Sequence, residues 1–460
     1  MSLHYGSPLG KIRTAVIICC LVLILGVFGY AYLSDTDNVV LSKEEILTNL
    51  EILEGDDLEF DYVSSYVKKY GVGRINSYKF NEVEEKLETG YYKELPEENA
   101  LAAETVRLFL ERFYDNIDLD NKGEVTDALL KCMLSSIGDP YAFYRTADEF
   151  VDYNTELEGG EEFVGIGVSI NPKTHEIVAV FNGSGAEAAK LQNYDVICAV
   201  NGTNVESMES DEIAAMIKGE AGTTVTITVK RCGELIDFSV ERKAIVSKSV
   251  IYRVIDNNVG YIQIIQFLHD TPTAFVEAVD YCEEQGVDAL IIDVRSNPGG
   301  LLYAVEEVID YLTPDDKTRV IDSYTDNTGK YVCYTTDGHS VDLPIVVLCN
   351  EDTASAGELF TSAMRDYGNE GVLDTTLVGT KTFGKGIVQS SFTLYDNSAI
   401  TYTIGYYNPP CDVNFHGIGV SPDIEVTKTL SFDEQLDSAM EEALKLINEN
   451  KNAAGLPAAA

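Results

Sequence analysis

After Val259, apolar runs alternate regularly with amphipathic segments, and this pattern limits the possible folds more than any other in the chain. The apolar runs have the composition of buried strands, and the segments between them have helical spacing. Because parallel strands need a crossover connection, this alternation predicts βαβ units and a largely parallel sheet. The segments are, in chain order, GYIQIIQF, TAFVEAVDYCEEQG, DALIIDV, LLYAVEEVIDYL, PIVVLCN, GELFTSAMRDYG and TTLVGT.

Two regions of different pattern precede this alternation. From Phe163 to about Lys243, short alternating strands surround one helical segment, SDEIAAMIKG. Residues 34–158 have helical spacing in an acidic background. We therefore predict an α/β multidomain protein with a helical N-terminal region at 34–158, a strand-rich domain at 159–245, an α/β core at 246–430, and a C-terminal helix with a flexible tail at 431–460.

Composition excludes two classes of partner. The chain has 460 residues, of which 45% are hydrophobic and 24% are charged, as in a globular protein of several domains. Its 76 acidic residues outnumber 33 basic residues, which gives a net charge of −43. Because such a surface repels phosphate groups, we expect no nucleic acid partner and no binding to an anionic lipid surface.

A run without charged residues, at 14–33, predicts a membrane anchor. At 1.5 Å per residue, a helix of this length spans about 30 Å, the thickness of a bilayer core. Lys11 and Arg13 precede the run and Asp35 follows it. The positive-inside rule then predicts a cytoplasmic segment at 1–13, one transmembrane helix, and an extracytoplasmic remainder. A cleaved signal peptide is the alternative, but its apolar region usually has about 7–15 residues, so the length favours the anchor.

The sequence indicates no metal, cofactor or disulfide framework. None of the nine cysteines forms a CxxC pair, and seven of them, an odd number, lie outside the apolar run. The segment DLDNKGEV is similar to a calcium loop. Counting from Asp118, however, places Leu129 at the twelfth position, where a bidentate glutamate is required. We interpret this segment as an acidic turn between helices.

The first candidate for chemistry is Ser355, in NEDTASAGELF, where an apolar strand passes directly into a helix. A helix N-terminus presents free N–H groups and a positive dipole end, which suits a nucleophile. The alternative is that Ser355 or Thr353 only caps the helix, because serine and threonine are favoured caps.

The second candidate is the turn in IIDVRSNPGGLL, where Gly299 and Gly300 follow a buried strand. Two glycines leave backbone N–H groups uncovered by side chains, as an oxyanion hole requires. The alternative is an ordinary strand-to-helix turn with glycine punctuation.

The third candidate is Lys385, which lies between two glycines in TKTFGKGIVQ. A serine hydroxyl needs a base, and a lysine can serve if burial disfavours its charged form. Phe383 and Ile387 are close in sequence, and no acid lies within six residues on either side. Gln389 could orient the amine without adding charge. The flanking glycines would let the chain pass close to the site.

These segments together resemble a known family, the carboxy-terminal processing peptidases, also called tail-specific proteases. TASAGELF, NPGG, TFGKGIVQ and HGIGVSPDIEV are its motifs, and SSIGDPYAFYRTADEF precedes them. The resemblance covers about 129–426. It implies Ser355 as the nucleophile, Lys385 as the general base and Gln389 as the residue that orients the lysine. The implied oxyanion hole combines the N–H groups of these residues: Ala356 and either Gly299 or Gly300.

The resemblance also implies the architecture. The peptidase core at 246–430 would be a crotonase-like spiral of βαβ units, and the domain at 159–245 an inserted PDZ domain. A PDZ loop binds a peptide's C-terminal carboxylate through backbone N–H groups while the peptide adds as a strand. The expected partners are proteins or peptides with exposed C-termini, and a second copy of the chain in a homodimer. The implied carboxylate-binding loop is GIGV, which comprises Gly165, Ile166, Gly167 and Val168.

The chain departs from the family pattern at three places. Gly357 stands where the family often has serine. The spacing from Ser355 to Lys385 is longer, with extra residues around NEGVLDTT. LQNYDVI replaces the usual Pro-Gly-Asp turn of the PDZ domain, which puts the ligand pocket in question more than the fold.

Two other functions are compatible with parts of the sequence. Ser355, Asp374 and His416 follow the order of an α/β-hydrolase triad, but Thr353 replaces the first glycine of the G-x-S-x-G elbow. A membrane-tethered PDZ scaffold without catalysis is the second alternative. The presence of Ser355, Lys385 and Gln389, the three catalytic residues that the resemblance implies, argues against the scaffold.

Overall fold

The computed structural model describes residues 41–53, 62–72, 74–160, 162–314, 319–324, 331–335, 341–411, 413–427 and 433–453. The chain divides into two compact units, residues 1–150 with 389–404 and residues 151–388 with 405–460. The predicted anchor at 14–33 lies outside the described residues. Within the described ranges, no helix combines the length and the apolar character needed to cross a bilayer.

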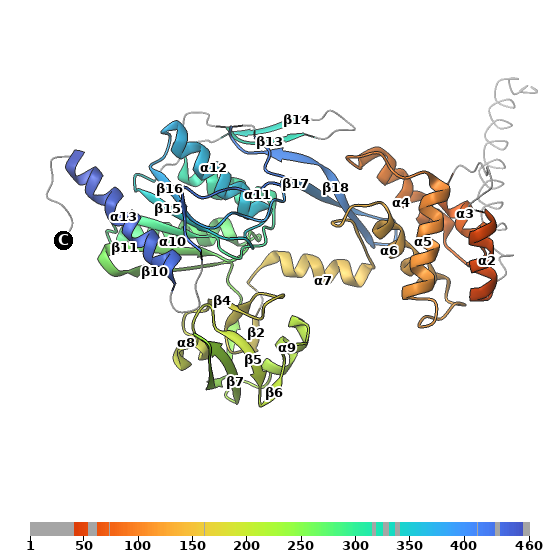
Figure 1. The fold of residues 1–460 in the computed structure, drawn as a ribbon, viewed down its shortest axis with the longest axis horizontal. Helices are drawn as coiled ribbons and strands as arrows, with labels where there is room; N and C mark the ends of the chain where they lie inside the picture. Colours follow the sequence, from red (N-terminus) through yellow and green to blue (C-terminus); the bar gives the residue numbers. More distant parts are fainter. Residues whose placement is uncertain are drawn as a thin grey trace, which may run out of the picture. The chain divides into compact units, whose positions relative to one another are not determined.

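The first unit is mainly helical, as the sequence predicts. The segment DLDNKGEV forms a turn before a helix, and the Asn121 side chain accepts hydrogen bonds from the N–H groups of Gly123 and Glu124. This is an ordinary N-cap and agrees with the interpretation of an acidic inter-helix turn. The elements are α2 (Lys43–Leu53), α3 (Val63–Tyr70), α4 (Ser77–Gly90), α5 (Glu98–Arg112), α6 (Lys122–Ser136) and β1 (Phe143–Arg145); α7 (Ala147–Glu158) follows (Figure 1).

Residues 389–404 belong to this first unit, although the sequence places them within the peptidase core. The buried Lys79 amine of α4 forms ion pairs of 2.8 Å with both Asp127 and Asp396. The Tyr402 hydroxyl donates to the Lys86 carbonyl, also in α4. The contacts of α4 with Asp396 and Tyr402 join segments more than 300 residues apart in the chain, so no local sequence pattern could indicate them.

The strand-rich segment folds as a small domain of antiparallel strands with two helices. In β7, the buried residues Val225, Ile227 and Val229 alternate with more exposed threonines, the pattern of a sheet with one buried face. Strands β6, β5, β7 and β8 form one sheet in that order, and β3–β4 and β2–β9 are paired separately. The elements are β2 (Glu162–Gly165), β3 (Val168–Ile170), β4 (Ile177–Val180), α8 (Gly185–Ala189), β5 (Val196–Val200), β6 (Thr203–Asn204), α9 (Ser210–Ile217), β7 (Thr224–Arg231), β8 (Glu234–Glu241) and β9 (Lys243–Val246).

The α/β core contains the parallel sheet that the alternation predicts. Its strand order is β10-β11-β12-β15-β16-β19, and only the β10–β11 pair is antiparallel among the described strands. The strands are β10 (Val250–Ile255), β11 (Val259–Ile264), β12 (Ala289–Asp293), β15 (Ile345–Cys349), β16 (Thr375–Gly379) and β19 (Ile424–Glu425), with the 3₁₀ turn η1 (Asp256–Asn258). The prediction of a largely parallel sheet is confirmed.

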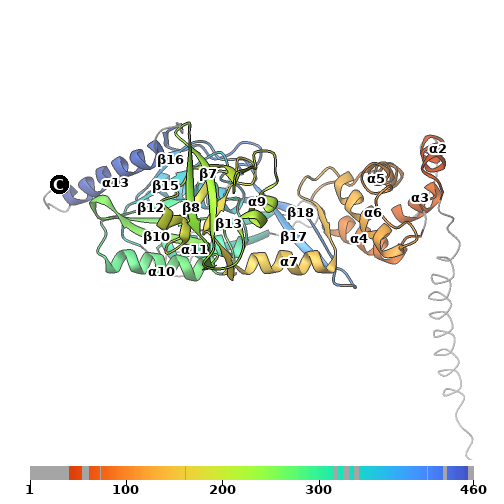
Figure 2. The same cartoon turned by 90° about the horizontal axis from the view of Figure 1, so that it is seen from below.

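Helices cover both faces of this sheet. Every residue of β12 and β15 is buried, because the side chains that alternate between the two faces all point into a packed layer. Helices α10 (Thr271–Glu284), α11 (Leu302–Leu312) and α12 (Ala356–Glu370) pack on one face. Helix α13 (Glu434–Ala453) packs on the other face, and Figure 2 shows α10 and α13 on opposite sides of the strands. The C-terminal helix is therefore part of the core of this unit.

A second sheet contains β13 (Arg319–Tyr324), β14 (Tyr331–Thr335), β17 (Ile387–Thr393) and β18 (Ala399–Asn408). The first part of β18 pairs with β1, and its last part pairs with β13. Because β12, β15 and β16 are parallel, the turns that follow them lie at one edge of the main sheet. The three motifs singled out in the sequence lie in those three turns.

Candidate active site

Ser355 lies at the start of α12, in a turn with unusual backbone geometry. Its φ is 55° and its ψ is −119°. A non-glycine residue in this region costs about 1–3 kcal/mol and is held there only by its surroundings. Ser355 therefore occupies the N-cap position, but without the extended backbone of an ordinary cap. A sharp strand-to-helix turn of this kind presents the nucleophile in α/β-hydrolases.

The turn after β12 is fastened to the Ser355 turn by backbone and side-chain hydrogen bonds. The Ala354 N–H donates to the Asn297 carbonyl at 2.9 Å, and the Thr353 hydroxyl donates to the Val294 carbonyl at 2.8 Å. A Cβ atom on Gly299 would lie 2.7 Å from the Ser355 Cβ. Glycine is therefore required for this approach, and the structure brings the two predicted elements together.

The predicted oxyanion donors differ in their present partners. The Gly299 N–H donates to the Asn297 Oδ1 atom at 2.8 Å. Within the described ranges, the N–H groups of Ala356 and Gly300 donate a hydrogen bond to no protein acceptor. Gly300 has a φ of 138°, and a Cβ atom there would lie 2.0 Å from the Phe267 carbonyl oxygen. Of the two glycine alternatives, Gly300 is the one with an N–H left to donate.

A buried carboxylate, Glu358, connects the nucleophile turn to the lysine loop. Its Oε2 atom accepts hydrogen bonds from the N–H groups of Ser355, at 3.0 Å, and Lys385, at 2.6 Å. Its Oε1 atom accepts from the Gly384 N–H and the Thr382 hydroxyl, both at 2.6 Å. The structure thus brings the main chains of Ser355 and Lys385 to one carboxylate oxygen.

Burial and hydrogen bonding act in opposite directions on the pKa of Glu358. The side chain is 0% exposed, and this burial raises the pKa of the Glu358 carboxyl group. The four hydrogen bonds oppose the rise, because they stabilise the charged form. All four of these donors are neutral N–H or O–H groups.

Sequence reasoning missed Glu358, although a signal was present. Ser355 and Glu358 have the S-x-x-E spacing of a capping box, in which the glutamate reaches back to the N-cap N–H. That spacing predicts the contact with Ser355. It does not predict the contacts with the loop around Lys385, which lies 27 residues away in the chain.

The glycines beside Lys385 allow a close approach to another segment of the core. Gly384 has a φ of 101°, and a Cβ atom there would lie 3.2 Å from the Gly419 nitrogen. A Cβ atom on Gly386 would lie 2.9 Å from the His416 nitrogen and the Asn414 Oδ1 atom. The glycines therefore let the lysine loop pack against the HGIG segment, and this packing positions the loop.

The surroundings of Lys385 agree only in part with the expected apolar slot. Lys385 is partly buried, and its carbonyl accepts a 2.8 Å hydrogen bond from the Tyr407 hydroxyl. Ile387 is buried, as expected. Phe383 is 53% exposed and its ring faces the Lys173 amine instead.

Gln389 lies in β17, in the segment that belongs to the first unit. Its Nε2 atom donates to the Thr403 hydroxyl at 3.3 Å. The role predicted for Gln389 toward the lysine stays a prediction.

The alternative Ser-His-Asp triad does not fit this arrangement. Asp374 immediately precedes β16, and its carbonyl accepts from the N–H of Ile345, the first residue of β15. Ser355 follows the other end of β15, and five residues of parallel strand span about 16 Å. The Asp374 carboxylate accepts from the Asn450 amide of α13. Asp374 and Ser355 therefore lie at opposite edges of the sheet.

The predicted carboxylate-binding loop lies between β2 and β3. Ile166 is buried and its carbonyl accepts from the Ala186 N–H at 2.8 Å. Gly167 has a φ of 82°, and a Cβ atom there would lie 2.3 Å from the Ser184 Cβ. The loop therefore has a defined backbone path. Gly165 ends β2, and Val168 begins β3.

Two further observations concern cysteine and metal chemistry. Among the described residues, the cysteines at positions 132, 198, 232, 282, 349 and 411 form no disulfide. In the part of the chain that the structure describes, no group of three or more His, Cys, Asp or Glu side chains is arranged to hold a metal ion.

Comparisons with known proteins identify the family and the inserted domain. Residues 258–426 match the peptidase family S41, and residues 164–241 match the PDZ domain. The chain is 34% identical over 317 residues to a carboxyl-terminal-processing protease of Synechocystis sp., a match that covers 67% of this chain and 72% of that protein. It is 33% identical over 309 residues to a "Probable CtpA-like serine protease" of Staphylococcus haemolyticus, a match that covers 66% of this chain and 61% of that relative.

A solved structure has the same architecture. The photosystem II D1 C-terminal processing protease superposes with a TM-score of 0.50 at 25% identity, over 76% of this chain and 92% of that chain. The predicted resemblance is confirmed, including the inserted PDZ domain. This chain belongs to peptidase family S41, the carboxyl-terminal-processing serine proteases.

Proposed function

We propose that this protein is a serine endopeptidase that cleaves extracytoplasmic proteins near their C-termini, with Ser355 as the nucleophile and Lys385 as the general base. One observation carries the proposal. The main chains of Ser355 and Lys385 share the Glu358 carboxylate at the strained start of α12, beside the glycine turn. Strained backbone and a buried charge are characteristic of functional sites.

The proposed chemistry uses these residues in turn. The neutral Lys385 amine takes the proton of the Ser355 hydroxyl as its oxygen attacks the scissile carbonyl. The N–H groups of Ala356 and Gly300 then stabilise the oxyanion. The lysine gives its proton to the leaving amine, and water hydrolyses the acyl-enzyme by the same steps. Gln389 orients the lysine in this proposal.

The PDZ domain supplies substrate selection. The C-terminal carboxylate of a substrate binds the loop from Gly165 to Val168, and the peptide adds as a strand along β3, beside α9. Main-chain hydrogen bonding of this kind accepts many sequences, so a free C-terminus is the main requirement. Peptides with an amidated C-terminus should be cleaved at a lower kcat/KM than the same peptides with a free carboxylate.

The location and assembly are further parts of the proposal. The segment at 14–33 anchors the protein as a single-pass membrane protein with residues 1–13 in the cytoplasm, because the positive-inside rule favours that orientation. The helical first unit provides the surface of a homodimer. Retention in membranes after a high-salt wash tests the anchor, and release of a protein that begins near Ser34 would identify a signal peptide instead.

Substitution of the dyad tests the activity. Ser355→Ala and Lys385→Ala should each abolish peptide cleavage while the protein remains folded, because members of one catalytic unit act together. Lys385→Arg should fail as well, since a guanidinium does not deprotonate. Lys381→Ala, in the same loop but exposed, is the matched control and should retain activity. Substantial cleavage by Lys385→Arg would exclude a lysine base.

An active-site serine probe separates the proposal from a scaffold without catalysis. Labelling of the wild-type protein, and its loss in Ser355→Ala, would support an active peptidase. Absence of labelling at Ser355 in a folded protein would favour the scaffold.

A further inference from the structure

The turn in which the chain departs from the PDZ pattern contains a strained tyrosine. Tyr194, in LQNYDVI, has a φ of 72°, in the left-handed region that favours glycine. The turn itself is firmly held, because the Tyr194 N–H donates to the Ile177 carbonyl at 2.8 Å. The buried Asp195 beside it is paired with Arg231 at 2.5 Å. A bulky residue at such a position costs about 1–3 kcal/mol, so its side chain calls for an explanation.

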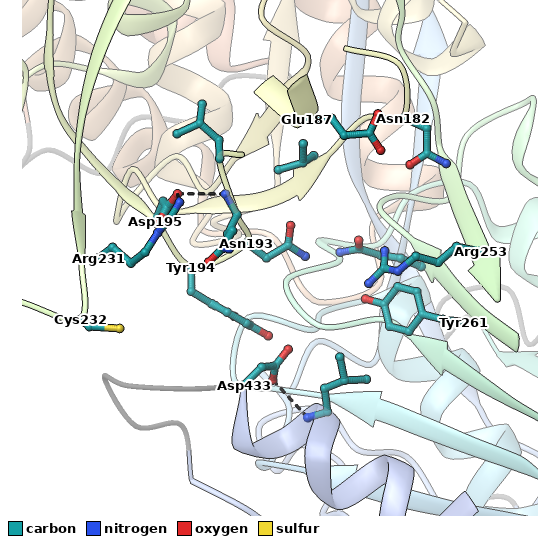
Figure 3. Close-up of a pocket in the computed structure, with 15 residues that line it drawn as sticks. Asn182, Glu187, Asn193, Tyr194, Asp195, Arg231, Cys232, Arg253, Tyr261 and Asp433 are labelled. Carbon is teal, nitrogen blue, oxygen red and sulfur yellow. Dashed lines mark hydrogen bonds and ion pairs between the residues drawn. The ribbon is translucent and has the colours of Figure 1, made fainter. Parts of the chain in front are cut away.

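The Tyr194 ring leaves its own domain and meets the peptidase core. The Arg295 guanidinium lies 5.4 Å from the centre of the ring, within the range of a cation–π contact. Burial raises the pKa of the Tyr194 hydroxyl, in agreement with a ring enclosed at an interface. Figure 3 shows Tyr194 projecting across a cavity toward Asp433, which belongs to the core.

Arg295 connects this contact to the active site. Its guanidinium is buried and bonds Asp293 and Asp433, each at 2.6 Å. The backbone N–H of Arg295 also donates to the Asp293 Oδ1 atom at 2.9 Å. Arg295 therefore has a fixed position, and it directly precedes the turn at 296–300 that contacts Ser355. A side chain that packs against Arg295 therefore contacts the residue next to the turn at 296–300.

The rest of this interface combines a buried apolar cluster, which includes Phe181 of the PDZ domain and Ile251 of the core, with a cavity. A cavity of about 650 Å³ lies between the PDZ domain and the core, lined by both. The Gln263 amide donates across the interface to the Val178 carbonyl at 2.8 Å, and the Asn171 amide donates to Asp352 at 2.9 Å. Because a cavity forfeits dispersion contacts, the ring of Tyr194 adds contact area where the interface is hollow.

We propose that Tyr194 is a positioning residue that docks the PDZ domain on Arg295 and thereby holds the 296–300 turn in its catalytic arrangement. This inference rests on the proposed peptidase function and adds a structural connection between substrate selection and catalysis. It also explains the departure from Pro-Gly-Asp, because a glycine at position 194 would relieve the strain but could not reach Arg295.

Kinetics of three substitutions test the role. Tyr194→Gly should lower kcat at least tenfold, with KM for a peptide of free C-terminus changed less than twofold, while its thermal midpoint is not lowered. Tyr194→Phe keeps the aromatic face and should retain kcat within twofold. Tyr194→Leu keeps the bulk without the face and should resemble Tyr194→Gly. An unchanged kcat in Tyr194→Gly, or equal losses in all three variants, would overturn the proposal.

The absence of tryptophan from the sequence permits a test that needs no catalysis. Tyr194→Trp gives a single tryptophan at the interface, and Leu235→Trp gives one on the same domain at a side chain that is 67% exposed. Tyr194→Trp should emit at shorter wavelength and be less quenched by acrylamide than Leu235→Trp. Equal emission and equal quenching would show that position 194 is not docked. This outcome is independent of whether the peptidase activity itself is found.

Discussion

Two buried carboxylates, one at the end of β12 and one in the first turn of α12, are held in opposite ways. Asp293, at the end of β12, is 1% exposed and is paired with the Arg295 guanidinium at 2.6 Å. It also accepts a 2.6 Å hydrogen bond from the Tyr261 hydroxyl. Glu358, in the first turn of α12, is 0% exposed and is held by N–H and hydroxyl donors. Asp293 is thus neutralised by a cation, whereas Glu358 is held mainly by backbone N–H groups. We call the first group, Asp293 with Arg295 and Asp433, the Arg295 cluster.

The difference indicates separate roles. A guanidinium is a large partner with several fixed donors, so the Arg295 cluster can join distant elements, here the end of β12 and Asp433 before α13. Backbone N–H groups instead position the main chain that carries them. A single carboxylate can then fix the backbones of Ser355 and Lys385 together, without a second cation close to the lysine. We expect loss of the Arg295 ion pairs to lower stability more than loss of Glu358 does, and Glu358 to fix the backbones of Ser355 and Lys385 relative to each other.

Removal of the cation should have the largest effect. Arg295→Met leaves Asp293 buried without its charge partner, and breaking a buried pair in this way costs about 3–5 kcal/mol. The free energy of unfolding in urea measures the loss. Arg253→Met, which removes an exposed arginine stacked on Tyr261, is the control and should cost less than about 1 kcal/mol. Equal losses in the two variants would show that the Asp293 pair adds no particular stability.

Removal of charge from the second cluster should act mainly on catalysis. Glu358→Gln keeps the shape but turns one oxygen into an NH₂ group that faces N–H or O–H donors. A misplacement of about 1 Å in a catalytic group can cost about 10²-fold in rate, so we expect a loss of about that size in kcat/KM.

Glu358→Gln should lower the free energy of unfolding by about 1–3 kcal/mol, the cost of an unsatisfied buried group. This loss is smaller than the one expected for Arg295→Met. Glu370→Gln, at the exposed end of the same helix, should leave both quantities unchanged. If Glu358→Gln retains full activity, the shared carboxylate does not position the dyad.

A third carboxylate, Glu306, is partly buried, and its removal should have the smallest effect. The Glu306 Oε1 atom has no hydrogen-bond partner among the described residues, and burial raises the pKa of Glu306 to about 7. Since the folded-state pKa exceeds the unfolded value of 4.5, the folded state keeps a proton that the unfolded state loses. The contribution to stability is therefore complete below pH 4.5 and disappears as the pH rises through about 7.

Glu306→Gln should reduce this pH dependence. A pKa shift of one unit corresponds to about 1.4 kcal/mol, and partial exposure of the side chain lowers the effect to about 1–2 kcal/mol between about pH 5 and pH 8. Urea midpoints at the two pH values measure it. The neighbouring Glu307→Gln, at an exposed position, should retain nearly the wild-type slope, and an identical slope in Glu306→Gln would show that Glu306 does not titrate as described.

Local periodicity was enough to predict a large part of this protein. Apolar runs alternating with helical segments predicted the parallel sheet, because a strand buried on both faces and an amphipathic helix each leave their own pattern. Three motifs with glycine, serine or lysine after apolar runs indicated the candidate site residues. The family resemblance follows from the same motifs.

How those turns are held depends on contacts that form only in the folded protein. Glu358 has a capping-box spacing to Ser355, yet its contacts with Thr382, Gly384 and Lys385 join residues 24 to 27 positions away. The packing of α13 on the sheet and the transfer of residues 389–404 to the first unit are equally nonlocal. The glycines beside the lysine are required by close contact with a segment about 30 residues further along the chain. Such contacts depend on which surfaces meet after the chain has folded, and local propensity contains no record of them.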